Sequence, residues 1–172
     1  MLHPRRRPAL RAPAAACKEP TACAVYPGMM PEEPAARGAP CPSLPVHVTI
    51  GTHRRLPVFA DEAVALNVYL LVREHPLTLA AVLMPNHLHW LLARSADLER
   101  TVERFKTHST RRAEAAGHQG RLWQPSYFDA LVEPESRLRR IAAYLLTNPV
   151  AAELAPSWGE YPWACLHPSL TE

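Results

Sequence analysis

An abrupt change of pattern near residue 45 constrains the fold most, because it confines regular structure to the part of the chain that follows. Residues 1–44 are crowded with proline, alanine and arginine and have almost no aliphatic periodicity. Such a segment buries too little apolar surface to offset the entropy lost on ordering. We therefore predict a disordered extension over residues 1–44 and one domain over residues 45–172, a length typical of a single hydrophobic core.

Beyond this boundary, hydrophobic periodicity predicts strands and helices in alternation. Period-two alternation or short apolar runs indicate strands, and apolar residues spaced three and four apart indicate helices. The predicted strands span residues 46–52, 77–84, 87–93 and 126–133, and the predicted helices span residues 61–75, 97–116 and 136–148. Asp61 and Ser136 are expected to cap two of the helices, and Pro149 is expected to end the last one.

The order of these elements predicts an α+β fold. Strand, helix, strand, strand, helix, strand is the order of a ferredoxin-like split βαβ unit, an antiparallel sheet with both helices on one face. The last helix is an addition, and the opposite face of the sheet is left for it and for a site. Because side chains alternate along a strand, His87 and His89 should point to that face, and Leu88 and Trp90 to the two helices.

The charges indicate where nucleic acid could bind. Residues 1–44 hold six of the 19 Lys and Arg residues and three of the 16 Asp and Glu residues, which leaves 13 of each sign in the domain. A neutral domain needs a local basic patch to hold nucleic acid. The basic residues of segment 100–121 are Arg100, Arg104, Lys106, Arg111, Arg112 and Arg121. We predict that Lys106, Arg111 and Arg112 contact DNA phosphates.

A His-x-His triplet and the last predicted helix carry the candidate chemistry. His87 and His89 are spaced to share one divalent ion, although such a triplet alone is more often structural. A polar stripe runs beside the apolar stripe of the last helix. It consists of Arg137, Arg140, Tyr144 and Asn148. A tyrosine in the company of arginines and an asparagine is typical of a group directed at phosphate.

These motifs resemble those of the REP-associated tyrosine transposases, relatives of the single-tyrosine insertion-sequence transposases. MPNHLHWLL is similar to the His-hydrophobe-His (HUH) strand of this family, and YLLTNPVAAEL is similar to its YxxxNPVxAGL segment. Other landmarks of the family resemble, in order, VHVTIGTHRRLPVF, ERFKTHSTRRAEAAG, LWQPSYFDALV and YPWACL. The resemblance covers nearly all of residues 46–166.

The resemblance implies a metal-dependent endonuclease and strand transferase that acts on single-stranded or hairpin DNA. His87, His89 and Asn148 would hold Mg²⁺ or Mn²⁺, and Tyr144 would attack the scissile phosphate to form a covalent 5′-phosphotyrosine. Arg137 and Arg140 are expected to bind DNA and to favour the ionised phenol. A homodimer is left open.

Two other functions stay open at this stage. Pro125 and Glu133 stand where the family commonly has basic residues, which favours a hairpin-binding protein that has lost cleavage. A small zinc hydrolase would need a carboxylate base and a third ligand outside the tyrosine helix, and the sequence offers neither clearly. Glu153 replaces a common glycine of the family, a change that we expect to leave the chemistry unaffected.

The sequence also predicts the compartment. No apolar run approaches the roughly 18 residues that span a bilayer. The four cysteines fit neither paired zinc knuckles nor a disulfide framework, so we expect free thiols. Both features predict a cytoplasmic protein with no membrane partner.

Overall fold

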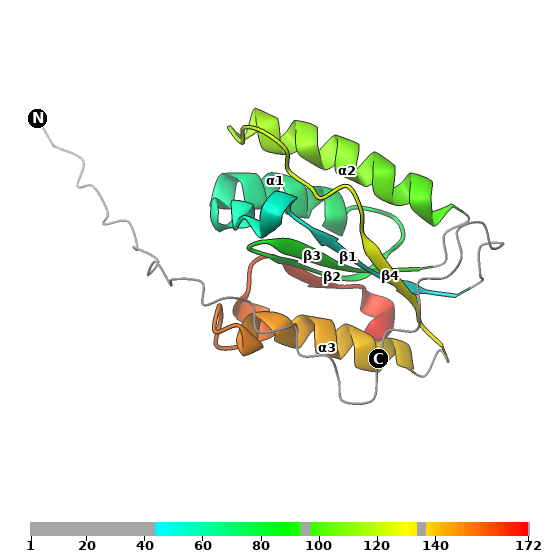
Figure 1. Ribbon diagram of the computed structural model, residues 1–172. Helices are drawn as coiled ribbons and strands as arrows, with labels where there is room; N and C mark the ends of the chain where they lie inside the picture. The colour runs from blue at the N-terminus through cyan, green and yellow to red at the C-terminus, as the bar shows by residue number, and fades with distance from the viewer. Residues whose placement is uncertain (1–43, 94–96, 134–136, 172) are drawn as a thin grey trace, which may run out of the picture. The chain divides into compact units, whose positions relative to one another are not determined.

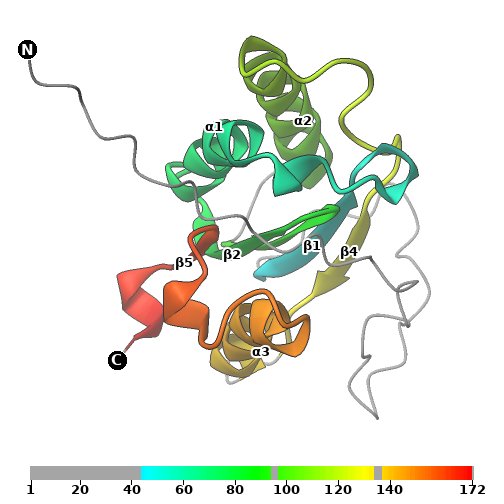
Figure 2. The ribbon, with the colours of Figure 1, turned by 90° about the vertical axis from the view of Figure 1, so that its left-hand side faces the viewer.

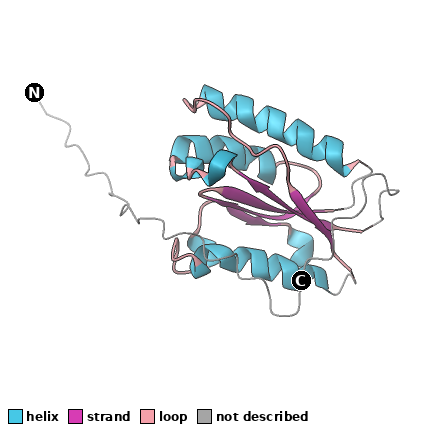
Figure 3. Cartoon of the chain, in the orientation of Figure 1, coloured by secondary structure: helices cyan, strands magenta, loops and turns pink. Residues whose placement is uncertain are grey.

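The domain is built on one antiparallel sheet of five strands (Figure 3). The computed structural model describes residues 44–93, 97–133 and 137–171, so the predicted disordered extension lies outside the described residues except for Leu44. The strands are β1 (Val46–Gly51), β2 (Thr78–Met84), β3 (His87–Leu92), β4 (Phe128–Leu131) and β5 (Ala164–Leu166). The helices are α1 (Glu62–Arg73), α2 (Leu98–Ala115) and α3 (Leu138–Ala151).

The strand order is β4-β1-β3-β2-β5, and all neighbouring strands are antiparallel. Helices α1 and α2 cover one face of the sheet, and α3 lies on the other (Figure 1, Figure 2). The order of the first four strands, with two helices on one face, is that of a split βαβ unit. The α+β class, the antiparallel sheet and the added third helix are therefore confirmed. Strand β5 was not predicted, because its three residues carry too little periodicity.

Apolar side chains at every second position of β1 and β3 fill the layer between the sheet and helices α1 and α2. Ile50, Leu88 and Trp90 have no exposed surface there. The indole Nε1 of Trp90 donates to Oγ1 of Thr78 at 2.8 Å, and that hydroxyl donates to a main-chain carbonyl of α1 at 2.6 Å. A slip of β3 by one residue would bury His89 in this core and expel Trp90. The core thus fixes the face to which the histidines point.

Helix α3 packs on the opposite face, mainly against β2. Its apolar stripe and the facing strand residues form a second buried cluster. The main members are Ala80, Val82, Met84, Leu91, Leu138, Ala142, Leu145 and Leu146. Full burial of a leucine side chain contributes about 2 kcal/mol, so several such contacts hold α3 firmly on the sheet.

The prediction that Pro149 ends α3 was wrong, because the helix continues to Ala151. Pro149 has no N–H to donate to the carbonyl of Leu145 one turn earlier, a loss that normally breaks a helix. Here Nδ2 of Asn148 donates to that carbonyl at 3.0 Å and to the carbonyl of Tyr144 at 3.2 Å. The asparagine amide therefore replaces the missing backbone donor. The predicted cap at Ser136 lies outside the described residues.

The first two helices begin where the sequence predicts. The side chain of Asp61 accepts from the backbone N–H groups of Ala63 at 2.9 Å and Val64 at 3.2 Å. Asp97 accepts from the N–H of Arg100 at 3.0 Å. Each such cap typically contributes about 1 kcal/mol. In the part of the chain that the structure describes, no helix has the length and apolarity needed to cross a membrane.

Candidate functional site

Two imidazoles meet on the sheet face that α3 covers. They belong to His87 and His89, here called the imidazole pair, which alternate with Leu88 and Trp90 as predicted. Their Nε2 atoms lie 3.0 Å apart, and the ring planes are almost perpendicular, at 86°. His89 is only 3% exposed, so its ring is held by the surrounding structure.

The other nitrogen of each ring also has a partner. Nδ1 of His87 lies 2.6 Å from Oδ1 of Asn86, an acceptor, and therefore donates its proton there. Nδ1 of His89 lies 3.2 Å from Oγ1 of Thr49 and 3.2 Å from Nε2 of His47. A hydroxyl both donates and accepts, so Thr49 suits either tautomer of His89. The sequence did not predict these three orienting residues, although Thr49 pairs directly with His89 across the sheet.

The imidazole pair fits a shared cation. Two ligand atoms at right angles, each about 2.1 Å from an ion, are about 3.0 Å apart, which is the observed separation of the Nε2 atoms. A histidine that binds a metal ion commonly donates a hydrogen bond from its other ring nitrogen, as Nδ1 of His87 does to Oδ1 of Asn86. Among the described residues, no group of three or more His, Cys, Asp or Glu side chains is arranged to hold a metal ion. An amide oxygen is compatible with Mg²⁺ or Mn²⁺ as a further ligand.

Burial keeps the histidines of this region neutral. It lowers the pKa of His47 from 6.5 to about 4. Burial, followed by the positive charge of Arg55, lowers the pKa of His87 to about 4 as well. For His89, burial and then the neighbouring histidines hold the pKa well below its usual value. Near neutral pH, these rings are therefore uncharged, and a cation can bind without first removing a proton from an imidazolium ion.

We expect the stability of the metal-free protein to fall as the pH drops from about 6.5 toward 4. The unfolded chain binds protons on His47 and His87 in this window, whereas the folded chain does not, so protonation favours unfolding. Thermal unfolding in EDTA, followed by circular dichroism, should give a decrease in Tm on the order of 10 °C. His47→Gln should have a shallower decrease than the parent. If Tm falls equally with pH in the two proteins, protonation of His47 is not a cause of the lost stability.

Helix α3 places Tyr144 on the same face of the sheet as the imidazole pair. Tyr144 is half-buried and packs against the cluster that includes Leu91 of β3. The helix runs from the end of the sheet where β4 ends to the end where β2 turns into β3 (Figure 1). Arg137 and Arg140 are exposed on its first turns. Asn148 uses Nδ2 within the helix, so Oδ1 is the atom that a cation would contact. Catalysis and ligation by these residues stay predictions.

Lys106, predicted to contact DNA, is tied to a neighbouring loop. Its Nζ donates to the carbonyls of Gln124 at 3.0 Å, Pro125 at 3.0 Å and Ser126 at 3.1 Å, and lies 5.5 Å from the ring centroid of Tyr127. An ammonium group has three donors, so a phosphate would have to replace one of these bonds. Lys106 thereby fixes the segment that carries Gln124.

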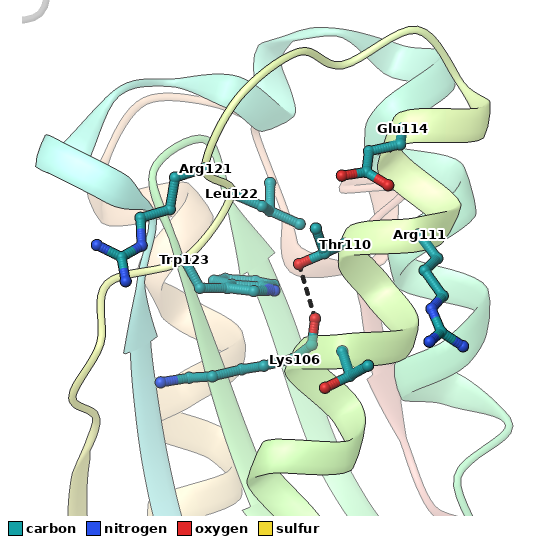
Figure 4. A pocket seen from close by; sticks show the side chains of 8 residues that line it. Lys106, Thr110, Arg111, Glu114, Arg121, Leu122 and Trp123 are labelled. Atoms are coloured by element: carbon teal, nitrogen blue, oxygen red, sulfur yellow. Dashed lines mark hydrogen bonds between the residues drawn. The ribbon is translucent and has the colours of Figure 1, made fainter.

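The arginines predicted to bind DNA from α2 lie in the layer opposite the imidazole pair. Arg111 and Arg112 are exposed. Arg111 and Arg121 line a pocket of about 420 Å³ beside α2. Figure 4 shows Arg121 and the amine of Lys106 on one side of α2 and Arg111 on the other. Arg111 and Arg112 therefore lie on the other side of the sheet from the imidazole pair.

One family profile and two solved structures are similar to this chain. A profile of the family described as "Transposase IS200 like" matches residues 41–148. A REP-associated tyrosine transposase bound to a REP hairpin has a similar structure, with a TM-score of 0.55 and 21% identity over 71% of this chain and 76% of that chain. A proposed transposase from Deinococcus radiodurans R1 gives a TM-score of 0.47 and 28% identity over 59% of this chain and 88% of that chain. No curated protein matches. From the profile match, this chain belongs to the IS200-like transposase family.

Proposed function

We propose that this chain is a metal-dependent endonuclease and strand transferase for single-stranded DNA at hairpins such as repetitive extragenic palindromes. The imidazole pair and Asn148 would hold Mg²⁺ or Mn²⁺, and Tyr144 would be the nucleophile. The observation that carries the proposal is the approach of the two Nε2 atoms to 3.0 Å on the face that α3 covers. Family membership and the hairpin bound to a relative support DNA as the substrate.

The residues would divide the reaction between them. Oη of Tyr144 attacks the scissile phosphorus, the bond to the 3′-oxygen breaks, and that oxygen leaves as a 3′-hydroxyl after taking up a proton. Arg140 lies one helical turn before Tyr144, where its charge favours the phenolate. A Mg²⁺ or Mn²⁺ ion bound at the imidazole pair would polarise the phosphate and offset charge on its oxygens. The phosphotyrosine retains the energy of the cut bond for rejoining.

A second candidate function is hairpin binding without cleavage. Pro125 and Glu133 replace residues that are commonly basic in the family, which weakens the attraction for phosphate. The amine of Lys106 is already bound to three carbonyls, one of them that of Pro125. A protein of this kind would bind the hairpin through the same fold but form no covalent complex.

One assay separates the two functions. The full chain is incubated with a labelled hairpin that has single-stranded flanks, in Mg²⁺ or Mn²⁺, and is then run on a denaturing gel. A transposase of the proposed type gives a labelled protein band that requires the divalent ion. Hairpin binding in a native gel, with no band under denaturing conditions, would support the second function. If the chain neither binds the hairpin in a native gel nor gives a labelled band on a denaturing gel, the proposal that it acts on hairpin DNA is contradicted.

We expect Asn148→Asp to change stability and metal affinity in opposite directions. A carboxylate cannot donate to the carbonyl of Leu145, so the free energy of unfolding should fall by about 1–2 kcal/mol in urea titrations. The same carboxylate is a stronger ligand, so Mn²⁺ should bind about tenfold more tightly by electron paramagnetic resonance. Asn67→Asp is the matched control. Nδ2 of Asn67 likewise donates to a main-chain carbonyl of its own helix, α1, at 2.9 Å. Helix α1 lies on the face of the sheet opposite the imidazole pair. Unchanged Mn²⁺ affinity in Asn148→Asp would contradict its role as a ligand.

A further inference from the structure

The end of β1 brings two further polar side chains to the candidate active site. A Cβ atom built on Gly51 would lie 2.8 Å from Oε1 of Gln124 and 3.3 Å from Nε of Arg55. The two side chains therefore occupy the space directly over this glycine. A larger residue at this position would have to push the ends of these two flexible side chains aside.

The sheet register places these side chains beside His87. Gly51 pairs with His87 across the antiparallel strands, just as Thr49 pairs with His89. Paired residues project from the same face, with Cβ atoms about 5 Å apart. The positive charge of Arg55 accordingly lowers the pKa of both histidines, after burial. The contact over Gly51 and the strand register thus both place the guanidinium of Arg55 beside His87.

A strained turn directs Arg55 to this position. Arg54 and Arg55 both have left-handed backbone conformations, with φ of 53° and 57°. Non-glycine residues adopt such conformations at a cost, and that cost is characteristically retained at functional sites. The turn is anchored by the buried hydroxyl of Thr52, which lies 2.7 Å from the carbonyl of Leu56 and 2.9 Å from that of Asn86. The hydrogen bonds of Thr52 therefore tie this strained turn to the β2–β3 turn that precedes His87.

The guanidinium of Arg55 is available to a ligand. Arg55 is exposed, and within residues 44–93, 97–133 and 137–171 no carboxylate lies at salt-bridge distance from it. Its planar fork of N–H donors matches the oxygens of a phosphodiester, and the amide of Gln124 adds a further hydrogen-bonding group. Arg55 thus brings a positive charge to the end of β1 beside His87.

We propose that Arg55, seated over Gly51 next to Gln124, is a phosphate-binding residue for single-stranded DNA at the imidazole pair. That the bound phosphate is the scissile one rests on the proposed function, whereas phosphate binding itself does not. Arg55 is distinct from the basic residues of α2, which lie in the opposite layer of the domain. It is also distinct from Arg137 and Arg140, which are exposed at the start of α3.

The test compares Arg55→Gln with Arg54→Gln. Both variants lose one positive charge from adjacent exposed residues with the same backbone conformation, but only Arg55 interacts electrostatically with the imidazole pair. Binding of a fluorescein-labelled oligodeoxythymidine is measured by anisotropy over a range of salt concentrations. Arg55→Gln should weaken binding about five- to tenfold and reduce the slope of log K against log salt by about 0.7, the value for one phosphate contact. Arg54→Gln should change both quantities much less.

A third variant and a second readout exclude a trivial loss of structure. Gly51→Ala keeps every charge but pushes the ends of the Gln124 and Arg55 side chains aside, so binding should weaken in the same direction. Mn²⁺ should bind Arg55→Gln at least as tightly as the parent, because a nearby positive charge has been removed. Equal loss of DNA affinity in Arg54→Gln and Arg55→Gln would overturn the proposal.

The outcome is separable from that of the proposed function. If the parent forms no covalent complex with DNA but Arg55→Gln selectively loses one phosphate contact, cleavage is refuted and the phosphate site stands. If the parent does form the complex and Arg55→Gln binds and cleaves like Arg54→Gln, the phosphate site is refuted and the nuclease stands.

Discussion

Tyr144→Phe should abolish the covalent protein–DNA complex while leaving hairpin binding intact. The substitution removes only the oxygen that would attack phosphorus, and the ring continues to pack at the edge of the α3 cluster. Loss of a nucleophile typically costs at least about 10⁴-fold in rate. The labelled band on denaturing gels should therefore disappear, whereas the dissociation constant in native gels should stay within about twofold.

Tyr127→Phe is the matched control for this experiment. It deletes the same atom from a half-buried tyrosine near Lys106, in the layer of α2. The complex should form at the parental rate in this variant, and the Tm of both variants should lie within a few degrees of the parent. Persistence of the complex in Tyr144→Phe would show that another residue is the nucleophile. Its loss in both variants would point to a general effect of tyrosine hydroxyls on the fold.

Substitution of the imidazole pair should have the second largest effect. His87→Gln and His89→Gln each remove an Nε2 atom from the point at which the two rings meet, 3.0 Å apart. We expect Mn²⁺ affinity to fall by roughly 100-fold or more, since even loss of an orienting partner commonly costs 10- to 100-fold. Mn²⁺ titrations by electron paramagnetic resonance measure this directly, and formation of the covalent complex should fall in parallel.

Two controls guard against misfolding as the cause. His108→Gln changes an exposed histidine of α2 in the opposite layer and should leave Mn²⁺ affinity unchanged. Asn86→Ala keeps both rings and removes only the acceptor 2.6 Å from Nδ1 of His87, so a loss of about tenfold is expected. If His89→Gln folds with the parental circular dichroism spectrum and binds Mn²⁺ equally well, the ion is held elsewhere or not at all.

The sequence predicted the features that follow from strict periodicity. The direction of His87 and His89 was predicted because Leu88 and Trp90, which alternate with them, are apolar, and the structure buries these two residues completely. The start of α1 was likewise predicted from Asp61, because a cap acts on its own first turn. Such features depend on neighbours within a few residues, which a single sequence displays.

The features that were missed depend on contacts distant along the chain or on unusual backbone conformations. The carbonyl partners of Lys106 near Gln124 could not be predicted, because only folding brings them to it. Arg55 was overlooked because the left-handed turn that aims it at the site leaves no periodic signal. Pro149 was taken as a helix end because the substitute donor from Asn148 could not be anticipated. Sequence patterns therefore predicted the candidate site, and the structure identified the residues that orient its histidines.

The contacts around the imidazole pair require a proton to change place when a cation binds. Nδ1 of His87 donates to Asn86, so its Nε2 is an acceptor, and in the metal-free protein the contact at 3.0 Å needs Nε2 of His89 to donate. Nδ1 of His89 then accepts from Thr49 or His47. Ligation through Nε2 requires the opposite tautomer, with the proton on Nδ1 and the Thr49 hydroxyl turned to accept it. Binding of a cation would thus reverse the direction of donation in the hydrogen bond that links His89 of β3 to Thr49 of β1.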